Sequence, residues 1–231
     1  MKHSKLLTST VAAAALAASM SFAPIASAEV SGSVSIANMY LWRGFDLSAG
    51  SAAVSGDLGF STGSDAFGFH ADLWGSSGDD SWGTEYDVIL GVGGASGSFS
   101  YDLSVVSYVY PNGGYQGETG ADTDIGEFME AILTLGFGPV SFSYYDNIEA
   151  KDGTNGDGLE DYSYYTLSAS VGSFSFLIGR HDNDVGDDPT HLDISYAYND
   201  NLSFTVSKFV ADEDLIDHDA HFVVSYSIPI E

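Results

Sequence analysis

Apolar and polar residues alternate along most of the chain, in short segments separated by turn residues. The first segment sets Val30, Val34 and Ile36 against intervening serines. An alternation with a period of two places each set of side chains on its own face of a strand, so each segment predicts a β-strand. About twelve such segments follow one another. They are joined by short turns near residues 62, 95, 138, 172 and 199 and by mostly longer, acidic loops near residues 45, 78, 117, 155, 185 and 214.

The polar positions of these segments favour a membrane barrel. They are mostly Ser, Gly, Thr and Asp, whereas the surface of a soluble protein carries interspersed Lys, Arg, Glu and Asp. Small polar side chains suit the interior of a barrel whose apolar face meets lipid. Strands of about ten residues also match tilted membrane crossings. Aromatic residues that suit an interfacial girdle end many apolar faces, namely Tyr40, Tyr86, Tyr144, Tyr165, Tyr198 and Tyr226.

The sequence therefore predicts an all-β fold, an antiparallel up-and-down transmembrane β-barrel of about 12 strands. Its turns on one side are short and periplasmic, and its loops on the other are longer, acidic and extracellular. The alternation alone is also compatible with a soluble periplasmic β-sandwich.

The first residues are typical of a secretory signal peptide. Lys2 and Lys5 precede an apolar segment at residues 11–22, and Ala26-Ser27-Ala28 offers a cleavage site. We expect residues 1–28 to be removed and residues 29–231 to form one outer-membrane barrel. The expected location is the cell outer membrane.

Charge and composition narrow the function. The chain has 33 acidic and 6 basic residues, a formal net charge of −27. Such a surface repels nucleic-acid phosphates and attracts cations, so nucleic acid is excluded as a partner. The chain contains no cysteine, which excludes disulfides and thiolate chemistry. Nothing in the sequence predicts a cofactor.

One motif stands out where the first strand is predicted to end. Tyr40-x-x-Arg43-Gly44-x-x-x-Ser48 follows soon after the leader. With the later elements Glu85-Tyr86-Asp87, Tyr101-Asp102 and Tyr108-x-Tyr110-Pro111, the chain resembles the TorF-type porins of proteobacteria, also known as the Gcw_chp conserved hypothetical family. The resemblance implies an outer-membrane barrel that conducts small solutes. It implies no catalytic residue and no particular substrate.

If the apolar faces meet lipid, acidic residues line the lumen. Acidic groups in a narrow pore favour cations, so we expect a passive channel for cations or neutral solutes. The alternative is a structural or adhesive barrel with a closed lumen, for which the loop from Pro111 to Asp124 is the candidate plug. Arg43 would then be a structural ion pair or a selectivity contact. The predicted lumen residues are Arg43, Asp57, Asp72, Glu85, Asp87, Asp102, Glu130 and Asp193, with His70, His191 and His221.

The acidic loops suggest weak Ca²⁺ binding, because carboxylate oxygens are the ligands that Ca²⁺ prefers. The candidates are Asp182, Asp184, Asp187 and Asp188, with a second oxygen-rich stretch at residues 152–161. Neither stretch has the EF-hand spacing, and solvated turn residues are the preferred explanation of both. The expected partners are outer-membrane lipid, lipopolysaccharide and small solutes or cations.

An outer-membrane hydrolase is the competing class. His191, Asp193 and Ser195 share one strand face, but neighbours at this spacing are roughly 7 Å apart and are expected to be too far from each other for direct hydrogen bonds. We therefore expect no enzymatic activity.

Overall fold

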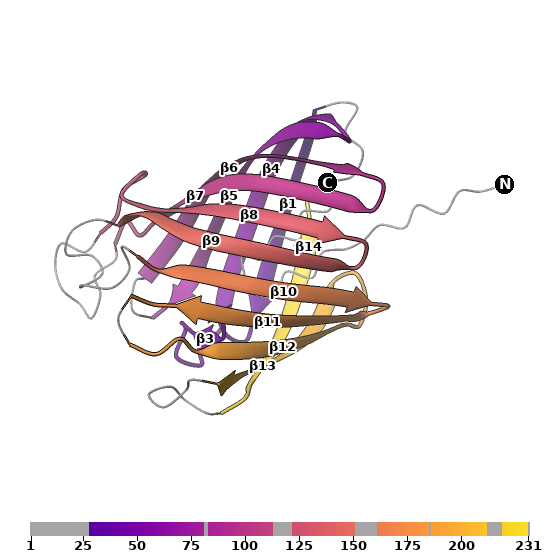
Figure 1. Cartoon of the computed structure of the whole chain (residues 1–231). Helices are drawn as coiled ribbons and strands as arrows, with labels where there is room; N and C mark the ends of the chain where they lie inside the picture. Colours follow the sequence, from indigo (N-terminus) through magenta and orange to yellow (C-terminus); the bar gives the residue numbers. More distant parts are fainter. Residues whose placement is uncertain are drawn as a thin grey trace.

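The computed structural model describes residues 28–80, 83–112, 122–150, 161–184, 186–211 and 219–230. The predicted signal peptide lies outside these residues, apart from Ala28. In the described part, twelve strands form one closed antiparallel barrel (Figure 1). β2 and β3 pair only with each other. The strands are β1 Glu29–Ala37, β2 Leu41–Trp42, β3 Phe45–Asp46, β4 Ala53–Ser64, β5 Phe67–Asp79, β6 Gly83–Ser96, β7 Phe99–Val109, β8 Phe128–Phe137, β9 Val140–Ala150, β10 Ser163–Val171, β11 Phe174–Asp182, β12 Thr190–Ala197, β13 Leu202–Ala211 and β14 His221–Pro229.

The barrel closes through its first strand. β1 pairs with β4 on one side, where Ser35 lies opposite Ser55, and with β14 on the other, where Ser35 lies opposite Ser227. Closure leaves no strand edge with unpaired backbone groups, which hydrocarbon would not tolerate. The predicted up-and-down barrel of twelve strands is confirmed.

The short turns have the residues that tight hairpins need. Gly138 and Gly172 begin two-residue connections between β8 and β9 and between β10 and β11. Their φ angles are 58° and 61°, a left-handed conformation that glycine adopts without the Cβ clash of other residues.

The outward face is apolar, as predicted. Leucine, isoleucine, valine and phenylalanine side chains at alternate strand positions are exposed in the isolated barrel, where a soluble protein would bury them. This arrangement excludes the soluble β-sandwich. In the described residues, no helix is long and apolar enough to cross a membrane. The exposed set includes Val34, Ile36, Leu58, Phe60, Leu73, Leu90, Leu103, Leu167, Phe176, Ile178, Val206 and Phe222.

Two predicted boundaries are wrong. β5 continues to Asp79 and β6 begins at Gly83, so the predicted loop near residue 78 is mostly strand; its small residues still pair across a register shift after Ser76. β1 ends at Ala37, and Tyr40 is not an interfacial anchor. Tyr40 is 3% exposed inside the barrel, where its hydroxyl donates a hydrogen bond to the Glu85 carboxylate.

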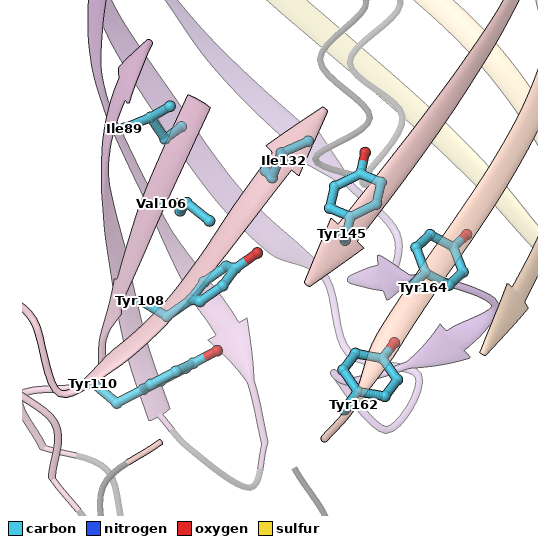
Figure 2. Packing of buried hydrophobic residues seen from close by; sticks show 8 residues of the cluster. All are labelled: Ile89, Val106, Tyr108, Tyr110, Ile132, Tyr145, Tyr162 and Tyr164. Carbon is cyan, nitrogen blue, oxygen red and sulfur yellow. The ribbon is translucent and has the colours of Figure 1, made fainter. Parts of the chain in front are cut away.

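The buried aromatic core lies inside the barrel, toward the end opposite the short turns. Figure 2 shows side chains of β6 to β10, and of residues that flank them, projecting toward the space that holds β2 and β3. Most members are tyrosines, whose hydroxyls need polar partners when buried. The cluster comprises Ile89, Val106, Tyr108, Tyr110, Ile132, Tyr145, Tyr162 and Tyr164.

Candidate functional site

The connection between β1 and β4, residues 38–52, folds into the barrel and is called the first loop here. Its hairpin pairs Leu41 with Asp46 and Trp42 with Phe45, so Arg43 and Gly44 form the two-residue turn. Their φ angles are 47° and 91°. A positive φ is unusual for a residue with a side chain and persists only where other contacts hold it.

Local hydrogen bonds keep the first loop compact. The Asp46 carboxylate accepts from the backbone nitrogens of Ser48 and Gly50 at 2.9 and 2.6 Å, and from the Ser48 hydroxyl at 2.7 Å. Ser48 Oγ in turn accepts from the Tyr40 backbone nitrogen at 2.8 Å, and Ser48 is fully buried. The four residues of the sequence motif, Tyr40, Arg43, Gly44 and Ser48, therefore all shape this inward fold.

Arg43 joins the first loop to the barrel wall. Its guanidinium makes a bidentate ion pair with Glu130 of β8, with Nη1–Oε1 and Nη2–Oε2 distances of 2.9 and 2.6 Å. Nη1 also donates to the Tyr162 hydroxyl at 3.1 Å. Arg43 is 4% exposed and Glu130 is 1% exposed. A buried ion pair with this geometry is costly to break, because the remaining partner becomes an uncompensated charge.

Four aromatic rings surround the same guanidinium. Its Cζ lies 4.5 Å from the ring centroid of Trp42, 4.6 Å from those of Tyr145 and Tyr164, and 5.6 Å from that of Tyr162. These distances are within the range of cation–π attraction. Burial raises the pKa of Tyr162 to about 12, against the opposing effect of Arg43, so this hydroxyl stays protonated at neutral pH. We call Glu130 with Trp42, Tyr145, Tyr162 and Tyr164 the Arg43 cage.

The far side of the first loop packs against β11, β12 and β13. His181 Nε2 bonds to the Arg43 carbonyl oxygen at 2.9 Å, and His181 Nδ1 to the Tyr162 hydroxyl at 2.8 Å. The Phe45 ring lies 4.8 Å from that of Phe209. A Cβ atom on Gly44 would approach Phe209 to 2.8 Å and His191 to 2.9 Å. Any larger residue at position 44 would therefore clash with the wall in this position of the loop.

A second acidic group lies beside the first loop, on β6. Glu85 accepts from the hydroxyls of Tyr40 and Tyr110 at 2.7 and 2.8 Å. Burial, and then the Glu85 carboxylate, raise the pKa of both tyrosines well above its usual range. Both therefore act as donors at neutral pH. Asp87 is fully buried on the same strand face, and among the described residues neither of its carboxylate oxygens has a hydrogen-bond partner.

The other predicted lumen acids lie further toward the short turns or along the wall. Asp57 accepts a hydrogen bond from Ser33. The His70 ring bridges Asp72 and Asp102 at 2.9 Å each. His221 is half-buried at the loop end of β14. The inward-facing positions thus bring Arg43, Glu85, Asp87 and Glu130 together. Asp57, Asp72 and Asp102 belong to other parts of the lumen, and Asp193 bonds to His191, which in turn contacts Tyr164 of the Arg43 cage.

The expectation that residues two apart on one strand are too distant to bond is wrong. His191 Nδ1 lies 2.9 Å from Asp193 Oδ1, and its Nε2 lies 2.7 Å from the Tyr164 hydroxyl. Long side chains lean along the strand and close the gap that the Cβ spacing leaves. Ser195 does not join them, since its hydroxyl bonds to Thr205 at 2.8 Å.

The candidate calcium ligands Asp182 and Asp188 bond to neighbouring protein groups. Asp188 bonds to Arg180 at 3.2 Å and to the Asn183 nitrogen at 3.0 Å, and Asp182 accepts from Tyr165 at 3.3 Å. Within the ranges that the structure describes, no three His, Cys, Asp or Glu residues are grouped to hold a metal ion. Residues 113–121 of the predicted plug and 152–160 of the second acidic stretch lie outside those ranges.

Sequence reasoning missed most of the Arg43 cage. Tyr145 and Tyr164 occupy inward strand positions and lie directly opposite each other on β9 and β10. The sequence signal that could have revealed them is tyrosine at inward-facing positions near the loop ends of strands. An aromatic ring at such a position occupies part of the lumen that a small polar side chain would leave open.

Comparison with solved structures shows similarity of fold. The chain matches one from the work "Unveiling the Mechanism Behind the in-meso Crystallization of Membrane Proteins" with a TM-score of 0.55 and 7% identity, over 87% of this chain and 83% of that one. It also matches the Salmonella typhi outer membrane phospholipase (OMPLA) dimer with bound calcium, with a TM-score of 0.48 and 12% identity over 87% and 90% of the two chains. For the KdgM porin the values are 0.42 and 8% over 88% and 99%.

A comparison with curated proteins found no match. The model of the Gcw_chp family, described as a bacterial protein of unknown function, matches residues 22–200, and the chain belongs to that family.

Proposed function

We propose that this protein is an outer-membrane channel for small solutes, with a preference for cations or neutral molecules and a mouth narrowed by its own first loop. The observation that carries the proposal is a gradient of exposure along the lumen wall. On β10 the inward residues change from buried Tyr164 through half-buried Ser168 to exposed Ser170 at the short turn. On β1 they change from buried Ser35 to exposed Ser31.

The lumen therefore opens toward the short turns and narrows toward the first loop. In the outer membrane the short turns face the periplasm, so the wide part would be a periplasmic vestibule. Small hydroxyl and carboxylate side chains line it, and carboxylates in a narrow, low-dielectric passage favour cations. Lipid and lipopolysaccharide are the expected surroundings.

The second candidate function is a structural or adhesive barrel with a closed lumen. The burial of Tyr40, Arg43 and Ser48 favours it, because the first loop fills the mouth in this structure. The two candidates differ in whether the loop ever leaves this position.

Recording from refolded protein in planar bilayers distinguishes them. We expect discrete conductance steps in KCl, with a reversal potential that shows preference for K⁺ over Cl⁻. Arg43→Ala should raise the step size or open probability, because it removes the contact between loop and wall. The matched control is Arg180→Ala, which removes the ion pair that the exposed Arg180 side chain makes with Asp188. This variant should behave like wild type. Silent bilayers for wild type and Arg43→Ala alike would favour the closed barrel, and a preference for Cl⁻ would contradict the proposed selectivity.

The proposal includes no enzymatic step. Ser195 bonds to Thr205 instead of His191, so this strand face lacks a nucleophile paired with its base. Lipase and protease activity in the purified barrel, lost on changing His191 to Ala, would contradict it.

A further inference from the structure

We propose that the Arg43 cage is a guanidinium-binding site, which the first loop fills with its own arginine in this structure. The ligand that it fits is a small solute bearing a guanidinium group, which would compete with Arg43 for the same place. This inference rests on the proposed function only for how such a solute reaches the cage; the site itself rests on the contacts of Arg43.

The contacts of the cage are directed at the guanidinium group. Glu130 meets both Nη atoms, at 2.9 and 2.6 Å, and the Tyr162 hydroxyl accepts from Nη1 at 3.1 Å. A parallel pair of N–H donors matches a carboxylate, and an ammonium ion cannot reproduce that geometry. The rings of Tyr145 and Tyr164 add faces at 4.6 Å from the Cζ atom. The combination therefore favours a planar guanidinium over Na⁺, K⁺ or a primary amine.

Most of the cage belongs to the barrel wall. Glu130 is on β8, Tyr145 on β9 and Tyr164 on β10, and Tyr145 and Tyr164 are paired across neighbouring strands. Glu130 is also held by the Tyr108 hydroxyl at 2.7 Å. These positions are set by the ladder of the barrel, so the cage should keep its shape when Arg43 is absent.

The arginine, in contrast, comes from a loop with strained backbone. Arg43 has a φ of 47°, a conformation that costs free energy for a residue with a Cβ atom. A free solute with the same head group does not carry that cost. The solute therefore competes with Arg43 without this backbone cost, against the high effective concentration that the tether gives Arg43.

The electrostatics of the lumen also favour a cation. Without Arg43, Glu130 would be a buried carboxylate with no counter-charge, close to Asp87, whose carboxylate oxygens have no hydrogen-bond partner among the described residues. A buried unpaired charge is strongly unfavourable. A cation that enters the cage removes this penalty, and a neutral molecule does not.

Chemical rescue of Arg43→Ala tests the site directly. We expect the purified variant in detergent to unfold roughly 10 °C below wild type, as loss of a buried ion pair predicts. Guanidinium chloride at about 1 to 20 mM, far below its denaturing range, should restore at least half of the loss along a saturable curve. Urea, NaCl and NH₄Cl at the same concentrations should not. If the variant does not fold alone, the refolding yield with and without guanidinium is the measurement.

Two further variants make the rescue specific. Arg43→Ala combined with Glu130→Gln should lose the response, because the carboxylate that orients the ligand is gone. Arg180→Ala changes a residue outside the cage and should show no response over the same range of concentrations. An equal response of the single and double variants, or no rescue of Arg43→Ala, would overturn the proposed site.

The rescue and the bilayer recordings fail independently. If guanidinium rescues Arg43→Ala but no conductance is recorded, the guanidinium site is supported and transport is rejected. If conductance is recorded but guanidinium does not rescue the variant, the channel is supported and the site is rejected.

Discussion

The surroundings of Asp87 are unfavourable for a charged side chain. It is fully buried on β6, two residues from Glu85 on the same face, and within the described part of the chain no donor contacts either carboxylate oxygen. Burying an unpaired carboxylate costs free energy that an amide of the same shape avoids in part.

Asp87→Asn is therefore expected to stabilise the barrel by about 1 to 3 kcal/mol. The substitution removes an ionisable group next to Glu85 and supplies an N–H donor. The midpoint of urea unfolding in detergent measures the change. Asp72→Asn is the matched control: its carboxylate bonds to the His70 ring at 2.9 Å, so the same substitution should destabilise. A loss of stability in Asp87→Asn as large as in the control would contradict the interpretation and indicate a cation bound by the carboxylate.

At the scale of elements, the first loop depends on Gly44 as much as on Arg43. Gly44 combines a φ of 91° with ring atoms less than 3 Å from any added Cβ. Gly50 in the same loop has a φ of 77° but open space around it. A substitution at Gly50 therefore has only a backbone cost, whereas a substitution at Gly44 has a backbone cost and a steric cost.

Gly44→Ala should release the first loop, whereas Gly50→Ala should leave it in place. Each loses roughly 1 kcal/mol from the backbone, and Gly44→Ala loses a further 1 to 3 kcal/mol or so from overlap with Phe209 and His191. Cleavage by trypsin after Arg43, followed by mass spectrometry, detects the release. Arg43 should be protected in wild type and in Gly50→Ala. Equal protection of Arg43 in Gly44→Ala would show that the lumen accommodates the methyl group.

The strands could be predicted from sequence, and the path of the first loop could not. Alternation decides which face a residue such as Leu58 or Phe176 occupies, because it is local and repeats within each strand. A loop has no such period. Tyr40 at a strand end fits an interfacial girdle and a lumen hydrogen bond equally well, and only the closed barrel brings Glu85 within 2.7 Å of its hydroxyl.

The same limit applies to the site. The inward position of Glu130 follows from the alternation, but its pairing with Arg43 joins residues 87 positions apart and depends on how far the first loop reaches. Tyr162 and His181 escaped notice because they lie at the loop ends of β10 and β11, where the pattern of the strands stops. Their roles follow from barrel closure, which brings both strands beside the loop.

For the molecule as a whole, the proposed channel would combine a wide periplasmic end with an acidic composition. The net charge is −27, but charges on the outer loops are screened within about 3 Å at 1 M salt. Carboxylates on the lumen wall are screened less, since little water separates them from a permeating ion. The Asp57 and Asp72 side chains are half-buried on that wall, which places them where ions would pass.

Asp57→Asn combined with Asp72→Asn should lower the K⁺ preference at both 0.1 M and 1 M KCl, as measured by reversal potentials across a salt gradient. The control, Asp65→Asn combined with Asp200→Asn, removes the same charge from exposed turns. Its effect should appear only at low salt, because the Debye length shortens from about 10 Å to about 3 Å over this range. If the two pairs responded alike at 1 M KCl, lumen carboxylates would not set the selectivity, and the preference would come from the field of the entire acidic surface.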